Sequence, residues 1–280
     1  MVITRFAPSP TGPLHLGHAF SALTAFNLAQ AAGGTFLLRM DDIDRERSKP
    51  EYEQMAFEDL AWLGLTWPEP VMRQSRSGDR FRAALGQLAD LGLTYPCSCS
   101  RGDIAAAAGA PQEGVPEFGP DGRIYPGTCR ERPMSDLKPD DAIRLDMAKA
   151  LEHGPLPGFH ETGPERPGTH ALDPRGMIEG IGDVVVARKG QAAAYHLCVV
   201  VDDTAQGVTL VTRGMDLFDA TPIHVLLAHL LGFPVPHYHH HRLIRDEAGK
   251  RLAKRDDARA IRKYREDGAT PEDIRAMVGL

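Results

Sequence analysis

The sequence lacks several features that define common classes of protein. The chain of 280 residues contains no run of about 18 uninterrupted apolar residues, which excludes an ordinary transmembrane helix. The N-terminus shows no basic start followed by a long apolar segment, so we expect no secretory signal peptide and a cytoplasmic protein without membrane contact. The P-loop pattern G-x-x-x-x-G-K-[ST] is absent, which excludes the commonest phosphate-binding loop. No internal repeat is visible.

Cysteine is scarce and unevenly distributed. The chain has four cysteines, and three of them, Cys97, Cys99 and Cys129, lie within about thirty residues. A reducing compartment disfavours disulfides, so clustered thiols favour a metal site. Three thiolates suit Zn²⁺, which takes four ligands in a structural site. From the residues alone the fourth ligand is Asp103 or a histidine, and reduced thiols without metal are the alternative. We interpret Cys198, inside an apolar run, as a small core residue.

Positive charge is in deficit overall but concentrated locally. The net charge is −6, which argues against bulk attraction to nucleic acid. Residues 242–265 nevertheless hold ten Lys or Arg against four Asp or Glu, so this segment is +6 and the remainder is −12. The pattern predicts either a local patch for phosphates or a solvated basic helix. Composition leaves both interpretations open.

The hydrophobic pattern predicts an α/β protein. The predicted strands are residues 2–7, 35–40, 197–201 and 207–214, and the main predicted helices are 14–32, 51–64 and 77–92. This alternation is typical of a parallel sheet with helices on its faces. The run 197–201 is continuously apolar, as in a strand buried on both faces, and it ends at Asp202 and Asp203. Thr221 predicts a helix N-cap, with Pro222 at the first helical position.

Residues 6–20, FAPSPTGPLHLGHAF, join a stiff loop to the beginning of a helix. The first N–H groups of a helix are unpaired and its dipole favours anions there. His15 and His18 lie on one face and can each donate a hydrogen bond to a phosphate oxygen. Gly17 lets a flat ring or a phosphate approach the backbone. The segment therefore predicts an anion site, and the alternative is two surface histidines on a helix that begins well.

The segment HYHHH, residues 237–241, also permits a metal interpretation. Alternate residues of a strand share a face, so His237, His239 and His241 could converge. Acidic partners are not evident nearby, and the basic segment follows directly. We therefore interpret these residues as surface or nucleotide-adjacent histidines.

Several motifs together resemble a known family. RFAPSPTGPLHLGH resembles the first signature of class I aminoacyl-tRNA synthetases, the HIGH motif, in its glutamate-specific form. LLRMDDIDRER, AYHLCVVVDD and TRGMDLFDATP resemble later segments of the same catalytic domain, in the same order. RLAKR at 251–255 falls where the second signature, KMSKS, is expected, with Ala253 in place of the usual serine. The resemblance implies a Rossmann-like α/β catalytic domain with a parallel sheet.

The resemblance also implies a division of the chain. Residues 1–94 and 175–236 would form a discontinuous Rossmann-like catalytic domain, interrupted at 95–174 by a Gly/Pro/Ala-rich, zinc-containing subdomain that binds the tRNA acceptor. Residues 237–280 would carry the basic second signature and the start of a helical stem-contact region. We expect no anticodon-binding domain and a monomer. These features, with the cysteine cluster, resemble the glutamyl-queuosine tRNA(Asp) synthetase family.

The activity implied by this family is activation of glutamate with ATP and Mg²⁺, without tRNA, to glutamyl-adenylate. The glutamate is then transferred to the queuosine base of tRNA(Asp). The implied partners are glutamate, ATP and tRNA(Asp) carrying queuosine. A truncated glutamyl-tRNA synthetase that charges a tRNA 3′ end, and a non-catalytic tRNA-binding paralogue, are the alternatives.

Site residues follow from the same resemblance. Two arginines and one acid complement glutamate, because guanidinium binds carboxylate bidentately. The residues implied for glutamate are Arg5, Ser9, Asp41, Tyr195 and Arg213, with Asp41 toward the ammonium. Those implied for ATP are His15, Gly17, His18, Arg251 and Lys254, of which His15, His18 and Lys254 are catalytic. The family's Cys-x-Cys and Tyr-x-x-x-Cys patterns imply Cys97, Cys99, Tyr125 and Cys129 as zinc ligands.

Overall fold

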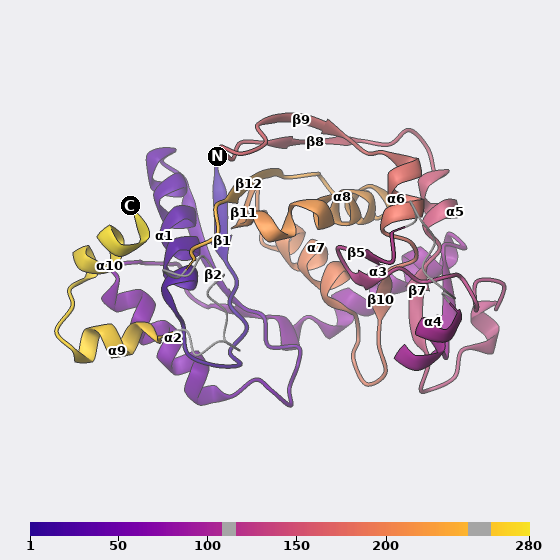
Figure 1. Cartoon of the computed structure of the whole chain (residues 1–280), viewed down its shortest axis with the longest axis horizontal. Helices are drawn as coiled ribbons and strands as arrows, with labels where there is room; N and C mark the ends of the chain where they lie inside the picture. The colour runs from indigo at the N-terminus through magenta and orange to yellow at the C-terminus, as the bar shows by residue number, and fades with distance from the viewer. Residues whose placement is uncertain (108–115, 246–258) are drawn as a thin grey trace.

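The computed structural model describes residues 1–107, 116–245 and 259–280, and Figure 1 shows their arrangement. The strands are β1 (Ile3–Phe6), β2 (Thr35–Met40), β3 (Met72–Arg73), β4 (Thr94–Cys97), β5 (Phe118–Gly119), β6 (Gly122–Arg123), β7 (Ala142–Leu145), β8 (Gly158–Glu161), β9 (Gly168–Ala171), β10 (Val185–Ala187), β11 (Leu210–Gly214) and β12 (His237–His241). The α-helices are α1 (Leu16–Ala31), α2 (Pro50–Trp62), α3 (Gly78–Asp90), α4 (Arg101–Ala107), α5 (Met147–Leu151), α6 (Pro174–Gly180), α7 (Tyr195–Ala205), α8 (Thr221–Leu230), α9 (Ile261–Glu266) and α10 (Pro271–Val278). Short 3₁₀ helices are η1 (Gln74–Arg76), η2 (Met134–Asp136) and η3 (Met215–Ala220). Arg251, Ala253 and Lys254 lie outside the described residues.

The centre of the molecule is the parallel sheet that the sequence predicts. β1 pairs in parallel with β2 and β2 with β3, while β11 pairs in parallel with β12. β11 lies beside β1, because the Thr209 N–H donates to the Ile3 carbonyl oxygen at 3.0 Å. The carboxyl ends of β1, β2 and β11 therefore meet at one edge. That edge is where open parallel sheets bind ligands.

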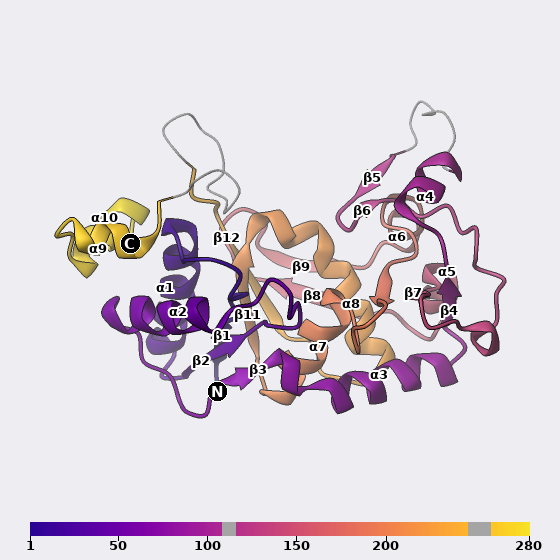
Figure 2. The ribbon, with the colours of Figure 1, turned by 90° about the horizontal axis from the view of Figure 1, so that it is seen from below.

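Helices cover this sheet, and the described residues form two large apolar cores and a small third core around the cysteine cluster. α1 packs on β1 and β2, and α10 packs on α1. The core beneath α1 includes Leu23, Met40 and Leu60, and the other large core includes Leu145 and Leu197. Both Figure 1 and Figure 2 place α9 and α10 at one end of the molecule and β4, β7, α4 and α5 at the other. Among the described residues, no helix has the length and apolar character needed to cross a membrane.

Residues 95–174 contribute strands to three of the described sheets, one of which is the short pair β5 and β6. β7 lies between β4 and β10 in an antiparallel sheet. β8 pairs with β9 and also meets β12, with Tyr238 opposite Glu161. Part of the predicted insertion therefore extends the sheet of β11 and β12. The division into domains stays a prediction.

The prediction of a strand at residues 197–201 is wrong, because these residues belong to α7. Every residue of α7 from His196 to Asp203 is buried, since the helix lies against α3, α8 and β10. A helix buried on all sides shows the same continuous apolar run as a buried strand, so five residues cannot distinguish the two. Asp202 and Asp203 thus lie near the end of a helix.

The start of α8 also differs from the prediction. Thr221 is not the N-cap but already has helical dihedrals (φ −58°, ψ −41°), because η3 leads directly into α8. Pro222 is therefore the second residue of α8 and not the first, as was predicted. The Thr221 hydroxyl instead accepts a hydrogen bond from Arg213 Nη2 at 2.8 Å. This contact places the start of α8 against the site described next.

Candidate active site

α1 begins with a reciprocal cap formed by two histidines. His15 is the N-cap, and its Nδ1 accepts the Gly17 N–H at 3.1 Å, while Nδ1 of His18 accepts the His15 N–H at 3.1 Å. Because both Nδ1 atoms accept backbone hydrogen bonds, a neutral ring at either position carries its proton on Nε2. The ring centroids are 3.8 Å apart. The helix start therefore orients two imidazoles with Nε2–H as the donor.

Gly17 is required by this cap. A Cβ at position 17 would lie 3.0 Å from Cε1 of His15 and 3.1 Å from its Nδ1. The His15 ring would have to move to accommodate it, and the cap would weaken. The sequence predicted close ligand approach at Gly17, and the structure adds this second reason for the absence of a side chain.

A cavity of about 340 Å³ opens beside the beginning of α1. His15, Gly17 and His18 all line it, so the structure brings these predicted phosphate-binding residues together. His241 at the end of β12 and Arg242 line the same cavity, in agreement with the nucleotide-adjacent interpretation of HYHHH. Arg251 and Lys254, predicted to complete this site, lie outside the described residues.

A second cavity, of about 440 Å³, adjoins the first. The two share Ser21, Arg213 and Leu217 as lining residues. All of the residues predicted to hold glutamate line it: Arg5, Ser9, Asp41, Tyr195 and Arg213. Tyr195 keeps 46% of its surface accessible at the start of the otherwise buried α7. The structure thus gathers the predicted amino-acid pocket next to the predicted nucleotide pocket.

The sequence analysis did not assign Arg39 and Asp203 to the site. Arg39 lines the second cavity, and Asp203 does not line it but binds Arg5 and Arg39, which do. Asp203 accepts from Arg5 Nε at 2.9 Å and from Arg39 Nη1 at 2.6 Å. Arg39 Nε donates to Asp41 Oδ1 at 2.7 Å, and the Arg39 side chain is fully buried. The sequence feature that could have indicated a role for Arg39 is one arginine inside the apolar strand TFLLRM, followed by two aspartates. With Arg213, the ionised groups carry three positive and two negative charges, which leaves one positive charge.

Asp41 and Asp203, the two aspartates bonded to these arginines, have pKa values shifted in opposite directions. Burial alone would raise the pKa of Asp203, but Arg5 and Arg39 outweigh it and hold the pKa below its usual value. For Asp41 burial dominates and raises the pKa, although Arg39 opposes the shift. Contact with two guanidinium groups rather than one explains the difference.

The three clustered cysteines lie close enough to share a metal ion. Their Sγ atoms are all within 4.8 Å of one another, and no other group of three or more His, Cys, Asp or Glu in the described ranges meets the same criterion. Cys99 Sγ and Cys129 Sγ are 3.5 Å apart, and Tyr125 Oη lies 3.4 Å from both Cys97 Sγ and Cys99 Sγ. Tetrahedral Zn²⁺, with Zn–S of about 2.3 Å and Zn–O of about 2.0 Å, requires S···S of about 3.8 Å and S···O of about 3.5 Å. The four side chains therefore fit such a site.

Asp103, the alternative fourth ligand, is directed elsewhere. Its Oδ2 accepts the Ser100 N–H at 2.8 Å and the Ser100 hydroxyl at 2.7 Å at the start of α4. Tyr125 is buried, and its Oη accepts the Cys129 N–H at 2.9 Å, which holds the phenol beside the thiols. The geometry favours Tyr125.

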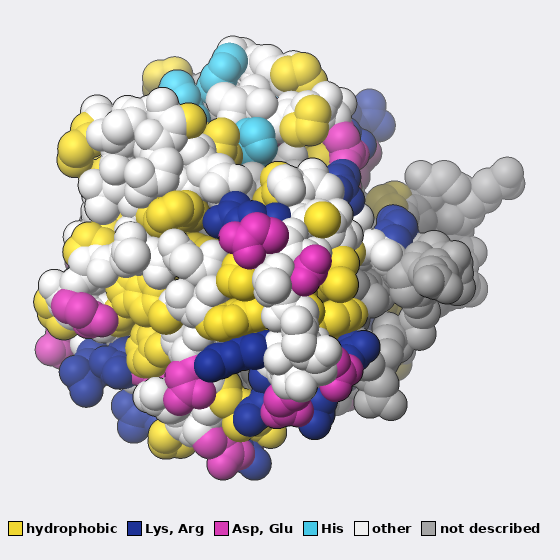
Figure 3. Space-filling view, turned by 90° about the vertical axis from the view of Figure 1, so that its left-hand side faces the viewer, with side chains coloured by type: hydrophobic (Ala, Val, Ile, Leu, Met, Phe, Trp, Pro, Cys, Tyr) yellow, Lys and Arg dark blue, Asp and Glu magenta, His cyan; other side chains and the backbone are white. Residues whose placement is uncertain are grey.

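The basic segment 242–265 is described only at 242–245 and 259–265. On the face drawn in Figure 3, Lys and Arg side chains are interspersed with Asp and Glu. Arg262 and Lys263 pair with Glu266, and Arg259 pairs with Asp267. These cations are therefore partly neutralised within the chain. A phosphate-binding patch here stays a prediction.

Comparison with known proteins agrees with this architecture. The family model for tRNA synthetases class I (E and Q), catalytic domain, matches residues 1–116 and 175–280. A crystal structure of a glutamate tRNA ligase from Elizabethkingia meningosepticum, in complex with its amino acid, superposes with a TM-score of 0.75 at 25% identity. The superposition covers 100% of this chain and 60% of that ligase. Fold and site together define a class I tRNA synthetase catalytic domain.

Two curated relatives narrow the assignment. The glutamyl-Q tRNA(Asp) synthetase of Rhodobacter capsulatus is 59% identical over 100% of both chains. The protein of the same name from Nocardia farcinica is 43% identical over 98% of this chain and 82% of the relative. The chain belongs to the glutamyl-Q tRNA(Asp) synthetase family, as the motifs predicted.

Proposed function

We propose that this protein activates glutamate with ATP and transfers the glutamyl group to the queuosine base of tRNA(Asp). One observation carries the proposal: the cavity at the start of α1 and the cavity lined by all the predicted glutamate residues adjoin and share Arg213. A full-length relative at 59% identity, named for this activity, supports it.

Activation joins a carboxylate oxygen of glutamate to the α-phosphorus of ATP. The bond from that phosphorus to the pyrophosphate oxygen breaks, and glutamyl-adenylate forms. Such a transfer depends on placing the reactants and on stabilising the charge that develops on the phosphates. His15 and His18 would donate Nε2–H to phosphate oxygens, beside the positive end of the α1 dipole. Mg²⁺ would accompany ATP and be held mostly by phosphates and water.

Arg251 and Lys254 remain our prediction for the pyrophosphate. A cation near the leaving group would neutralise charge as it develops. Both lie outside the described residues, so their place relative to His15 and His18 is part of the proposal.

The second cavity would hold the amino acid. Arg5 and Arg213 would each bind a carboxylate, and Asp41 would face the ammonium. The cluster of Arg5, Arg39, Arg213, Asp41 and Asp203, when ionised, carries one net positive charge, which complements the single net negative charge of glutamate. A neutral amino acid of similar length would leave a buried guanidinium without a counter-charge, at a cost in affinity.

Transfer would follow in the same place. A hydroxyl oxygen of the queuosine cis-diol attacks the acyl carbon of the adenylate and forms an ester. The bond between that carbon and the phosphate oxygen breaks, AMP leaves with the electron pair, and the hydroxyl proton passes to solvent.

We further propose that residues 95–174 form the inserted acceptor-binding subdomain, held by one structural Zn²⁺ on Cys97, Cys99, Cys129 and Tyr125. The spacing of the three sulfur atoms and of Tyr125 Oη supports this ligand set. A structural zinc would fix the Cys-x-Cys turn to the Tyr-x-x-x-Cys segment. We retain a cytoplasmic monomer as the expected state, and light scattering tests the monomer.

A series of assays, each depending on the one before, tests the proposed function. We expect ATP–pyrophosphate exchange that depends on glutamate and needs no tRNA. Labelled glutamate should then appear on tRNA(Asp) that carries queuosine, remain when the 3′ terminus is removed, and disappear when the cis-diol is oxidised beforehand. Label on the 3′ end of tRNA(Glu) would support the alternative of ordinary charging. Absence of exchange would support a non-catalytic paralogue.

A further inference from the structure

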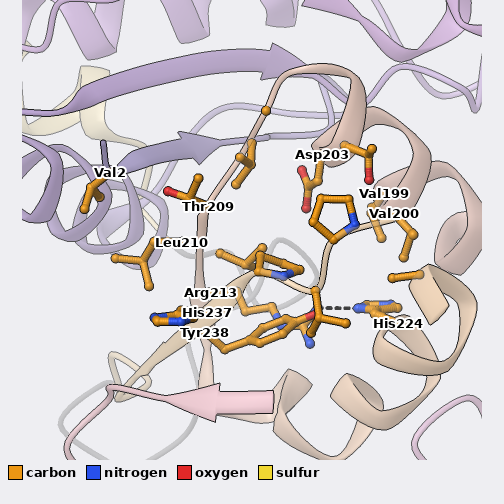
Figure 4. Close-up of a pocket in the computed structure, with 18 of the residues that line it drawn as sticks. Val2, Val199, Val200, Asp203, Thr209, Leu210, Arg213, His224, His237 and Tyr238 are labelled. Atoms are coloured by element: carbon orange, nitrogen blue, oxygen red, sulfur yellow. Dashed lines mark hydrogen bonds between the residues drawn. The ribbon is translucent and has the colours of Figure 1, made fainter. Parts of the chain in front are cut away.

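Arg213 is held by three side chains to which the sequence analysis gave no role at this arginine. Its Nε donates to His240 Nε2 at 3.0 Å, its Nη1 lies 2.7 Å from His224 Nδ1, and its Nη2 donates to Thr221 Oγ1 at 2.8 Å. The Arg213 residue is 6% exposed. Figure 4 shows Arg213 of β11 beside Tyr238 of β12, with His224 of α8 within hydrogen-bond distance. A guanidinium with one hydrogen bond from each nitrogen has a fixed plane.

The contacts with Arg213 determine the tautomers of both histidines. Arginine donates hydrogen bonds and accepts none, so each ring must present a lone pair to it. His240 presents Nε2, and a neutral His240 ring therefore carries its proton on Nδ1. That proton faces Glu161 Oε2, at an Nδ1 to Oε2 distance of 2.5 Å. Glu161 is buried, and its Oε1 accepts the N–H of His240 and of Gly163 at 2.9 and 2.5 Å.

The contact with Arg213 also fixes the tautomer of His224 and, through it, that of His196. His224 presents Nδ1 to Arg213, so its proton lies on Nε2 and is donated to His196 Nδ1 at 2.9 Å. The His196 proton is then on Nε2 and faces Asp121 Oδ1 at 3.0 Å. Asp121 lies in the turn between β5 and β6. Both series of contacts that leave Arg213 therefore end at a carboxylate.

The environment keeps the two rings beside Arg213 neutral. Burial and then the Arg213 charge lower the pKa of His240 to about 4, although Glu161 opposes the shift. Burial and Arg213 likewise hold the pKa of His224 well below its ordinary value. At neutral pH each ring thus has one proton and one lone pair, as the tautomers require.

We infer that Glu161 and Asp121 are positioning residues for Arg213, acting through His240 on one side and through His196 and His224 on the other. The inference rests on the proposed function only in the step that assigns Arg213 to the substrate. Each carboxylate fixes the proton of the adjacent ring and so fixes which nitrogen accepts from the next donor. Three of the five guanidinium N–H groups are engaged in this way. The other two, one on each Nη, keep a defined direction for a carboxylate in the cavity.

Imidazole NMR tests the network without any activity measurement. In protein labelled with ¹⁵N-histidine at pH 7, long-range ¹H–¹⁵N correlations should show the Nδ1–H tautomer for His240 and the Nε2–H tautomer for His224 and His196. Glu161→Gln should weaken the preference for the Nδ1–H tautomer at His240, and Asp121→Asn the preference for the Nε2–H tautomer at His196. Each substitution removes the anionic acceptor of the ring proton, while the contact that leads to Arg213 remains. An Nε2–H or doubly protonated His240 in the unmodified protein would overturn the inference.

Exchange kinetics test the effect on substrate binding. His240→Asn retains a donor near Glu161 and removes the acceptor for Arg213, whereas His240→Gln places an oxygen near the lost Nε2. Loss of one hydrogen bond to a charged group predicts a rise of about tenfold or more in the KM for glutamate with His240→Asn. His240→Gln should recover most of it. His239→Asn is the matched control, because the His239 ring contacts Thr162 and not Arg213.

The outcomes separate the inference from the proposed function. Without glutamate-dependent exchange in the unmodified protein the proposed function fails, and the NMR tautomers still decide whether the network exists. With exchange present, a KM for glutamate that stays within about twofold in His240→Asn overturns the positioning role. If His240→Asn and His240→Gln lower the melting temperature equally and leave the KM for glutamate unchanged, His240 has only a structural role. That result would also overturn the positioning role.

Discussion

The Arg5 guanidinium and the Asp203 carboxylate form a paired contact across 198 positions of sequence, with Nε–Oδ1 at 2.9 Å and Nη2–Oδ2 at 3.2 Å. The pair joins the end of β1 to the last turns of α7. Arg39 Nη1 reaches the same Oδ1 at 2.6 Å from β2. A carboxylate near the C-terminus of a helix opposes the helix dipole, and the two guanidinium groups offset this. One buried carboxylate therefore fixes three elements of the cavity wall.

Asp203→Asn removes the charge that balances these two arginines. We expect the free energy of unfolding at pH 7 to fall by about 3 kcal/mol, because two buried cations lose their partner. Urea denaturation measures the change. Asp79→Asn is the control, since the Asp79 side chain is 98% exposed and should matter little.

The same variant should reveal a dependence of stability on pH. The pKa of Asp203 lies below its unfolded value of about 3.9, so its contribution is complete above that pH and is lost as the pH falls through the folded-state pKa. The difference in unfolding free energy between the unmodified protein and Asp203→Asn should therefore shrink below about pH 4. A difference that stays constant as the pH falls through this region would contradict the assignment.

Arg5→Lys tests the amino-acid cavity. Lysine keeps the charge but lacks the planar fork that binds a carboxylate bidentately. We expect the KM for glutamate in ATP–pyrophosphate exchange to rise by about tenfold or more and the KM for ATP to change little, because Arg5 lines only the second of the two cavities. Arg82→Lys, on the exposed side of α3, is the control. An equal rise in both KM values would count against the placement of glutamate beside Arg5.

Gly17→Ala tests the cap at the start of α1. The added Cβ would meet the His15 ring, so we expect a loss of about 1 kcal/mol in stability from the weakened N-cap and a fall in exchange rate. Gly86→Ala is the matched control, because a Cβ there meets nothing within 4 Å inside α3. That variant should gain about 0.5–1 kcal/mol. Unchanged exchange in Gly17→Ala would show that the orientation of His15 does not matter for activation.

The cysteine cluster predicts one zinc ion per chain, measurable by elemental analysis of the purified protein. Tyr125→Phe removes one of four ligands and should weaken zinc retention in a chelator competition, while Asp103→Ala should not. The reverse result would make Asp103 the fourth ligand. Removal of zinc should lower the melting temperature, because a structural ion contributes folding free energy.

Local motifs were sufficient for much of the fold. The loop that begins at residue 6 and the helix predicted at residues 14–32 follow from short-range rules, and the structure confirms the helix as α1. α7 was mistaken for a strand because its burial on all sides is a tertiary property that removes the helical period from the sequence.

Some residues of the site could likewise be predicted from local motifs and others could not. The residues lining both cavities could be predicted where a motif carries them, as with His15, His18 and Arg213. Arg39, Asp203 and His240 could not be predicted, because their roles arise from partners on other elements. The roles of such residues can be assigned only from the structure, by following the hydrogen bonds of each buried charged group from one partner to the next.

A crystal structure with a non-hydrolysable sulfamoyl analogue of glutamyl-adenylate tests the central claim most directly. The account predicts the adenylate portion in the cavity beside His15 and His18, with the glutamyl carboxylate and ammonium between Arg5, Asp41 and Arg213. An analogue bound elsewhere, or a glutamyl group that contacts neither arginine, would contradict it.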